Sequence, residues 1–306
     1  MTTPTTKQVA LIVGASRGIG RQVAVDLAKN GYAVVVAAKS TSDAAATRPF
    51  PPDPNSSAST ISTVQREITE AGGQAHAIAV DVRDAASVQR MVDETVKTFG
   101  RLDVVVYNSG AIFWAPVAAT PLARFQLMQR VNPEGLYATV QAALPHFAAN
   151  AWRGRIVVVS PPIYSRFFRG KTAYAMGKVG MSVLTQGLAM DFEREGKTGM
   201  AITSIWPAAA IQSAATHDED PRDLRKADIY SDAILAMLRA PTNVVNGLLA
   251  LDEDFLREHA GVTDFSKYSL VEGTVPRRIM PERFPDLRVA EQDDEGKRKV
   301  SAAAKL

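Results

Sequence analysis

Short apolar runs alternate with longer stretches of helical spacing along most of the chain. In the longer stretches, apolar residues recur every three or four positions, as Val88, Val92, Val96 and Phe99 do, which is typical of amphipathic helices. Because strands that alternate with helices form parallel sheets, the pattern predicts an α/β fold: a doubly wound, seven-stranded parallel sheet with helices on both faces. We expect the strands over residues 9–13, 33–38, 75–80, 104–106, 155–159, 200–206 and 248–251.

Two segments interrupt this alternation. Residues 41–63 are rich in Ser, Ala, Thr and Pro, and proline neither continues a helix nor donates to a strand ladder. We therefore expect an inserted loop there. Residues 288–306 are charged and alanine-rich and predict a C-terminal tail. The rest of residues 1–287 is expected to form a single domain.

Composition excludes several classes of protein. The chain has 306 residues, 46% of them hydrophobic, which is enough for one large core. Its net charge is only +3 and it has no basic block with interleaved aromatics, so nucleic-acid binding is not indicated. The lack of cysteine excludes disulfides and thiolate metal sites. Residues 1–8 lack an apolar signal core, and no apolar run reaches the roughly 18 residues of a membrane span.

Three glycines separate the first predicted strand from the first helix. They are spaced Gly-x-x-x-Gly-x-Gly at Gly14, Gly18 and Gly20. Glycine lets the backbone turn tightly and approach a pyrophosphate, which the N–H groups of a helix N-terminus attract. The segment indicates a dinucleotide site, with a purely structural turn as the alternative. It also matches Gly-x-Ser-x-Gly around Ser16, the nucleophile motif of serine hydrolases, which would need a downstream histidine.

A phenol and an ammonium lie one turn apart on a helix that is predicted to begin at Thr172. Tyr174 and Lys178 are four residues apart, so both side chains lie on one face and can reach one pocket. The pKa of a free phenol is about 10, and a neighbouring cation lowers it, which suits proton transfer near neutral pH. A chance spacing on an exposed helix face is the alternative.

The glycine turn and the Tyr-x-x-x-Lys pair together resemble the short-chain dehydrogenase/reductase family. The resemblance implies a Rossmann-type domain that binds a nicotinamide cofactor. It also implies hydride transfer to or from a carbonyl or secondary alcohol. Within that chemistry, Tyr174 would be the acid–base group, Lys178 would lower its pKa, and Asn132 would support a proton relay.

The serine that binds the substrate carbonyl in this family is displaced in this chain. It stands thirteen residues before the tyrosine, which is Pro161 here. Ser160, one residue earlier, is the catalytic candidate in its place, and Tyr164 or Ser165 are alternatives. The departure leaves a second possibility, a cofactor-binding relative with little or no turnover.

The resemblance also implies the cofactor contacts. Arg17 and Lys39 are placed to neutralise a 2′-phosphate, and Ala38 stands where a carboxylate would exclude one, so we expect NADP(H) rather than NAD(H). Two solvated surface cations are the alternative. The inserted loop would either fold over the adenine end or be plain flexible surface. The expected cofactor-binding residues are Gly14, Ser16, Arg17, Gly18, Ile19, Gly20, Lys39, Asp81, Val82, Asn108, Gly110, Tyr174, Lys178, Pro207 and Ile211.

Other segments bear on substrate, assembly and metal binding. Trp114 and Phe167 belong to aromatic segments that indicate an apolar or acyl carbonyl or alcohol substrate. The apolar stripe from Met181 to Phe192 fits either internal packing or the interface of a homodimer or homotetramer. Residues 217–220 are expected to be a solvated loop rather than a metal site, because no second histidine lies at ligand spacing.

Within the family, the chain is most similar to the hydroxysteroid dehydrogenase-like subgroup, which carries the same Ser160-Pro161-Pro162 sequence. It would correspond to the dehydrogenase domain of that subgroup, which is linked to peroxisomes and lipid metabolism. The final Ala304-Lys305-Leu306 is a close variant of the peroxisomal address Ser-Lys-Leu. We expect binding to the peroxisomal import receptor in a eukaryote and a cytoplasmic location otherwise.

Overall fold

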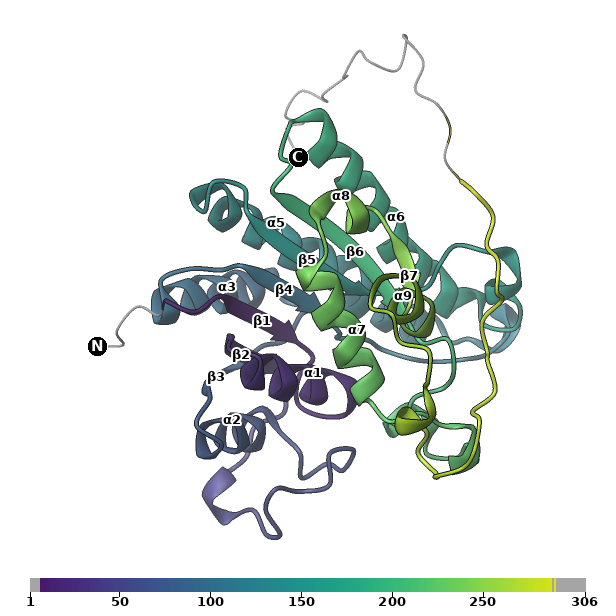
Figure 1. Cartoon of the computed structure of the whole chain (residues 1–306), viewed down its shortest axis with the longest axis horizontal. Coiled ribbons are helices and arrows are strands. Elements are labelled where there is room, and N and C mark those ends of the chain that lie inside the picture. Colours follow the sequence, from purple (N-terminus) through teal and green to yellow (C-terminus); the bar gives the residue numbers. More distant parts are fainter. Residues whose placement is uncertain (1–5, 288, 290–306) are drawn as a thin grey trace.

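A computed structural model describes residues 6–287 and 289 and shows one seven-stranded parallel sheet (Figure 1). The strand order is β3-β2-β1-β4-β5-β6-β7, with the crossover between β1 and β4. This confirms the predicted doubly wound Rossmann-type fold. The expected targeting tripeptide, residues 304–306, lies outside the described residues. The strands are β1 (Val9–Val13), β2 (Ala33–Ala38), β3 (Gln74–Ala79), β4 (Val104–Tyr107), β5 (Gly154–Val159), β6 (Met200–Trp206) and β7 (Leu249–Leu251).

Helices cover both faces of the sheet because alternate strand residues point to opposite sides. Ala10 and Ile12 of β1 pack in the core formed with α1, α2, α7 and α9. Leu11 and Val13 pack on the other face against α3, α5 and α6. The helices are α1 (Gly18–Lys29), α2 (Ile61–Glu70), α3 (Ala85–Phe99), α4 (Leu122–Gln129), α5 (Gly135–Ala149), α6 (Thr172–Arg194), α7 (Asp228–Arg239), α8 (Thr242–Val245) and α9 (Asp252–His259).

The long helical stretch expected over residues 122–149 contains a π-helix, Arg130–Glu134, between α4 and α5. Pro133 lies inside it and has no N–H to donate, so the ladder widens here rather than bending at a simple kink. The phenol of Tyr107 at the end of β4 donates to the carbonyl oxygen of Val131 at 2.6 Å. A buried strand residue thus supports the widened turn.

The inserted loop is shorter than expected at its C-terminal end. Helix α2 begins at Ile61, so the last three residues of the predicted segment 41–63 are helical. Thr60 and Thr63 cap this helix, each side chain accepting from the other residue's backbone N–H, which satisfies donors that a helix start leaves free. Among the residues the structure describes, no helix is long and apolar enough to cross a membrane.

Candidate active site

A pocket of about 440 Å³ lies at the carboxyl ends of the sheet strands. The glycine turn, the ends of β4, β5 and β6, helix α6 and the chain near residue 280 contribute to it. Ligands of doubly wound folds bind at this edge of the sheet. Its lining includes Arg17, Gly18, Ile19, Asn108, Gly110, Ile112, Trp114, Val159, Tyr164, Phe167, Lys171, Tyr174, Lys178, Trp206, Pro207, Ile211 and Ser213.

Tyr174 and Lys178 both line this pocket from helix α6, as their spacing predicted. Both are buried, at 2% and 4% exposure. The Lys178 ammonium donates to the carbonyl oxygen of Val159 at 2.9 Å. Burial lowers the pKa of Lys178 to about 7 and raises the pKa of Tyr174. Burial disfavours the charged form of each group, so in the protein alone the pKa values of the phenol and the amine both move towards their neutral forms. The lowering of the phenol pKa by a charged Lys178 stays a prediction.

The π-helix places Asn132 beside the same lysine. Asn132 is fully buried, and its side chain both accepts from the N–H of Ala111 at 2.8 Å and donates to the Ala111 carbonyl at 3.1 Å. A Cβ on Gly110 would stand 3.4 Å from the Lys178 ammonium and 3.7 Å from the Asn132 side-chain oxygen. The absence of a side chain at Gly110 thus keeps open the space between the two groups.

The glycine turn has the shape that a dinucleotide phosphate needs. Gly14 and Gly18 have φ of +90° and +55°, which favour glycine. A Cβ on Gly14 would lie 2.6 Å from the backbone nitrogen of Ser109, and Asn108 donates to the Gly14 carbonyl at 3.0 Å. In the described part of the chain, the backbone N–H groups of Ile19 and Gly20 have no acceptor. These free donors at the start of α1 fit a pyrophosphate.

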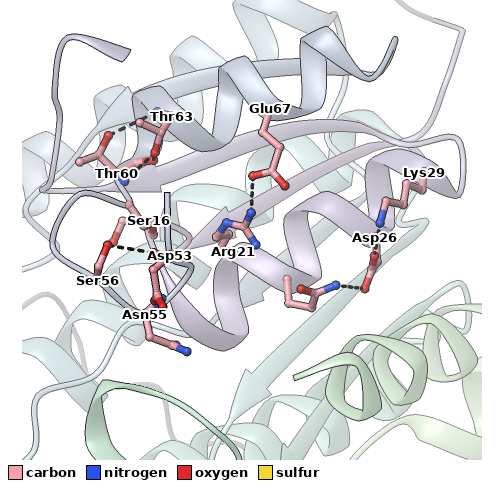
Figure 2. Close-up of polar contacts among 12 residues, drawn as sticks. Ser16, Arg21, Asp26, Lys29, Asp53, Asn55, Ser56, Thr60, Thr63 and Glu67 are labelled. Atoms are coloured by element: carbon pink, nitrogen blue, oxygen red, sulfur yellow. Dashed lines mark hydrogen bonds and ion pairs between the residues drawn. The ribbon is translucent and has the colours of Figure 1, made fainter. Parts of the chain in front are cut away.

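The inserted loop packs directly on this turn rather than being plain flexible surface. The N–H of Gly18 donates to the carbonyl of Pro54 at 2.8 Å, and the Ser59 hydroxyl donates to the carbonyl of Ser16 at 2.7 Å. Figure 2 shows Ser16 beside the loop residues around Asn55, whose side-chain oxygen is buried with no partner among the described residues. A Cβ on Gly18 would stand 3.5 Å from that oxygen.

Three cations and one carboxylate gather where β2 and β3 end. Asp81 forms ion pairs with Lys39 at 3.2 Å and with Arg83 at 2.5 Å, and its hydrogen bonds with Arg83 hold its pKa well below the usual range. The guanidinium of Arg17 donates to Ser40 at 3.4 Å. The cluster keeps a positive balance. Arg83 was not predicted from the sequence. Its position two residues after Asp81, at the end of a strand, could have indicated that it joins this cluster.

The structure does not bring Ser160 into the pocket. Ser160 is fully buried. The hydroxyl of Ser182, on helix α6, donates to the hydroxyl oxygen of Ser160 at 3.0 Å. Ser165 is exposed and outside the pocket lining. Tyr164 does line the pocket, and its phenol donates to the sulfur of Met280 at 3.4 Å, a weak acceptor. Of the alternatives, Tyr164 is the one whose hydroxyl reaches the site.

Aromatic rings and a late segment complete the pocket. Trp114 and Phe167 pack around the ring of Tyr174, with centroids 6.1 Å and 6.3 Å away. Ile279 and Met280 also line the pocket, and the N–H of Ile279 donates to the carbonyl of Ala208 at 2.8 Å. Sequence reasoning missed residues 277–280 because they match no motif.

Asp81 and Val82 do not line the pocket, whereas Pro207 and Ile211 do. The described part of the pocket includes no histidine, so a serine hydrolase using Ser16 finds no base there. No group of three metal-ligating side chains occurs in the residues the structure describes.

Comparison with known proteins defines the class. Residues 14–255 match the family model described as enoyl-(acyl carrier protein) reductase, and solved structures titled as short-chain dehydrogenases share the fold. The chain therefore belongs to the short-chain dehydrogenase/reductase family of oxidoreductases, as the two motifs predicted.

The relatives narrow the similarity further. Hydroxysteroid dehydrogenase-like protein 2 from Danio rerio is 35% identical over 281 residues, which cover 90% of this chain and 63% of the relative. The Homo sapiens protein of that name is 33% identical over the same length and 62% covered. The chain thus spans less than two thirds of these relatives. The expected similarity to this subgroup is confirmed.

Two bacterial structures are similar over nearly their whole length. A short-chain dehydrogenase from Mycobacterium thermoresistibile is 35% identical with a TM-score of 0.77, covering 89% of this chain and 93% of that one. A structure titled putative dehydrogenase from Xanthomonas campestris is 33% identical with a TM-score of 0.78, covering 94% and 100%.

Proposed function

We propose that this chain is an NADP(H)-dependent oxidoreductase that interconverts a carbonyl and a secondary alcohol on an apolar or acyl substrate. The observation that carries the proposal is that Tyr174 and Lys178 are buried together in the pocket that the glycine turn also lines. A nicotinamide dinucleotide, when bound, supplies or accepts the hydride. The free N–H groups at the start of α1 would hold its pyrophosphate.

Tyr174 would move the proton. A carbonyl that gains a hydride needs a proton on its oxygen, and a buried phenol whose pKa is raised stays protonated and can donate it. In the reverse direction Tyr174 must accept the proton, and a charged Lys178 favours the resulting phenolate. Lys178 would also hold the nicotinamide ribose, and Asn132 would support the relay beside it.

The cation cluster supports NADP(H) over NAD(H). Arg17, Lys39 and Arg83 outnumber the single carboxylate of Asp81 there, and Ala38 ends β2 without an acidic side chain. A 2′-phosphate would therefore meet a net positive charge there. Michaelis constants for NADPH and NADH test this preference directly. A lower constant for NADPH is expected, and equal or better use of NADH would contradict the preference for NADP(H).

Tyr164 is the best supported second donor to the substrate oxygen. It lines the pocket and gives its hydrogen bond to a thioether, which a carbonyl oxygen would readily replace. Pro161 carries no hydroxyl, and this favours the rival function, cofactor binding without turnover. A panel of aldehydes, ketones and acyl thioesters separates the two. Oxidation of NADPH with any of them supports the enzyme, whereas NADPH binding without turnover of any supports the rival.

Exposed apolar side chains on α6 support assembly into a homodimer or homotetramer. Met176, Val183 and Met190 are 56%, 58% and 50% exposed at intervals of seven residues, which places them on one face of the helix. Tyr137 of α5 is also 60% exposed. Contact with a second subunit would bury these apolar side chains away from water. Light scattering in solution tests the state, and a monomer would contradict it.

A further inference from the structure

Lys171 is a cation at the pocket wall for which the proposed reaction has no use. It is the N-cap residue of α6, one turn before Tyr174, and it lines the same pocket. Its ammonium lies 4.2 Å from the ring centroid of Phe167 and 5.6 Å from that of Trp114. Both rings pack around Tyr174. The ammonium is therefore held within an aromatic cluster that borders the reacting position.

The charge of Lys171 has no counter-ion within the described residues. No acid forms an ion pair with it and no oxygen accepts a hydrogen bond from it there, and burial alone lowers its pKa. The pocket acids Glu219 and Asp223 do not pair with it either. The cation–π contacts stabilise the charge but leave the three N–H donors without acceptors. A half-buried ammonium of this kind attracts an anion.

The surroundings define what such an anion is attached to. Ile112, Trp114 and Phe167 make that side of the pocket apolar, so a bare inorganic ion would gain one charge contact and no packing. A molecule with an apolar body and a negative group would use both features. The ammonium and the Tyr174 ring both lie against Phe167, with centroid distances of 4.2 Å and 6.3 Å. A negative group at Lys171 and a carbonyl at Tyr174 could therefore belong to one small molecule.

We propose that Lys171 is an anchor for a negatively charged group of the substrate, which makes the preferred substrate an apolar oxo acid rather than a neutral ketone. The position of the carbonyl rests on the proposed function, since it is taken to lie at Tyr174. The anion contact itself does not require turnover. Charge-assisted hydrogen bonds contribute about 1.5–3 kcal/mol, which corresponds to roughly tenfold or more in affinity.

The test compares 3-benzoylpropionate with its methyl ester, an acid and a neutral compound of the same shape. Calorimetric dissociation constants are measured for the full chain with and without NADP⁺. The wild type is expected to bind the acid at least about tenfold more tightly than the ester. Lys171→Gln should lose that preference, and Lys171→Arg should keep most of it. Arg169→Gln is the matched control, because Arg169 is exposed, carries the same charge and does not line the pocket.

Two results would overturn the proposal. One is a wild type without the preference, whether both compounds bind equally or neither binds. The other is a Lys171→Gln protein that is folded by its melting curve and still prefers the acid. If the preference depends on Lys171 but NADPH is never oxidised, the anion anchor stands and the proposed reaction fails, so the two failures are distinguishable.

Discussion

The Lys178 ammonium donates to the carbonyl oxygen of Val159 at 2.9 Å, so the amine of the pocket is anchored at the end of β5. Ser160 directly follows that strand, and its hydroxyl accepts from Ser182 outside the pocket lining. The end of β5 thus holds the Lys178 ammonium in the pocket, whereas the Ser160 hydroxyl stays outside it. The second donor to a substrate must come from elsewhere, and Tyr164 is the pocket residue that offers one.

The buried lysine makes stability depend on pH. Burial lowers the pKa of Lys178 from 10.5 to about 7, so between pH 7 and about 10.5 the unfolded chain binds more protons and wild-type stability rises with pH. Lys178→Met has no titratable group at this position, so it lacks this pH-dependent contribution to stability. Its melting temperature relative to wild type should be highest near pH 7 and fall towards pH 10, at about 2–4 °C per kcal/mol.

Lys97→Met is the control for that measurement, because Lys97 is an exposed lysine on α3. Its difference from wild type should not change with pH. A constant difference for Lys178→Met over the same range would contradict the assignment of a buried, weakly basic amine.

A carboxylate at the end of β2 should reverse cofactor choice. Ala38→Asp would face the 2′-phosphate across the cluster of Arg17 and Lys39, and repulsion should raise the dissociation constant for NADPH by about tenfold or more while leaving NADH binding little changed. Ala71→Asp adds the same charge at an exposed position beyond α2 and should change neither. Fluorescence titration measures both constants, and an unchanged NADPH constant in Ala38→Asp would refute the placement of the phosphate.

The inserted loop should contribute to cofactor binding through its contact with the glycine turn. Ser59→Ala removes the hydrogen bond to the Ser16 carbonyl, which should cost about 1 kcal/mol of stability and weaken NADPH binding several-fold. Ser57→Ala changes an exposed serine of the same loop and should do neither. If Ser59→Ala lowers the melting temperature but binds NADPH as tightly as wild type, the loop stabilises the fold without contributing to cofactor binding.

Asn132 should matter for both stability and turnover. Asn132→Ala removes two hydrogen bonds to the partly buried backbone of Ala111, a loss of about 1–2 kcal/mol. It also removes the side chain next to Lys178. Urea unfolding and steady-state rates measure the two effects. Asn243→Ala, on the exposed part of α8, should show neither. Full activity of the Asn132→Ala protein would contradict a role for Asn132 in the proton relay.

Much of the fold followed from the sequence because its signals are local. The apolar runs of β1, β2 and β6 coincide with the predicted strands residue for residue. The Gly14 turn and the Tyr174 pair converge on one pocket because strand-to-helix turns of a parallel sheet meet at the same edge. The strand alternation that turned Ser160 away from the site was also visible in its position.

What the sequence could not show depends on contacts between distant segments. The carbonyl of Pro54 finds the N–H of Gly18 only once the loop has folded back, and composition alone favoured a free surface. Ile279 enters the pocket through a backbone contact that leaves no pattern in the side chains. The spacing of Tyr174 and Lys178 was visible in the sequence, whereas the burial that raises the pKa of the phenol depends on how distant segments pack around it.

The most direct test of the central claim is a comparison of wild type with Tyr174→Phe, with NADPH binding followed by fluorescence and hydride transfer by nicotinamide absorbance on the carbonyl panel. Both proteins should bind NADPH with similar dissociation constants. Tyr174→Phe should turn over about 10²–10⁴-fold more slowly, the usual contribution of a general acid. A Tyr174→Phe protein that reduces the carbonyl at the wild-type rate, or a wild type that does not bind NADPH, would contradict the account.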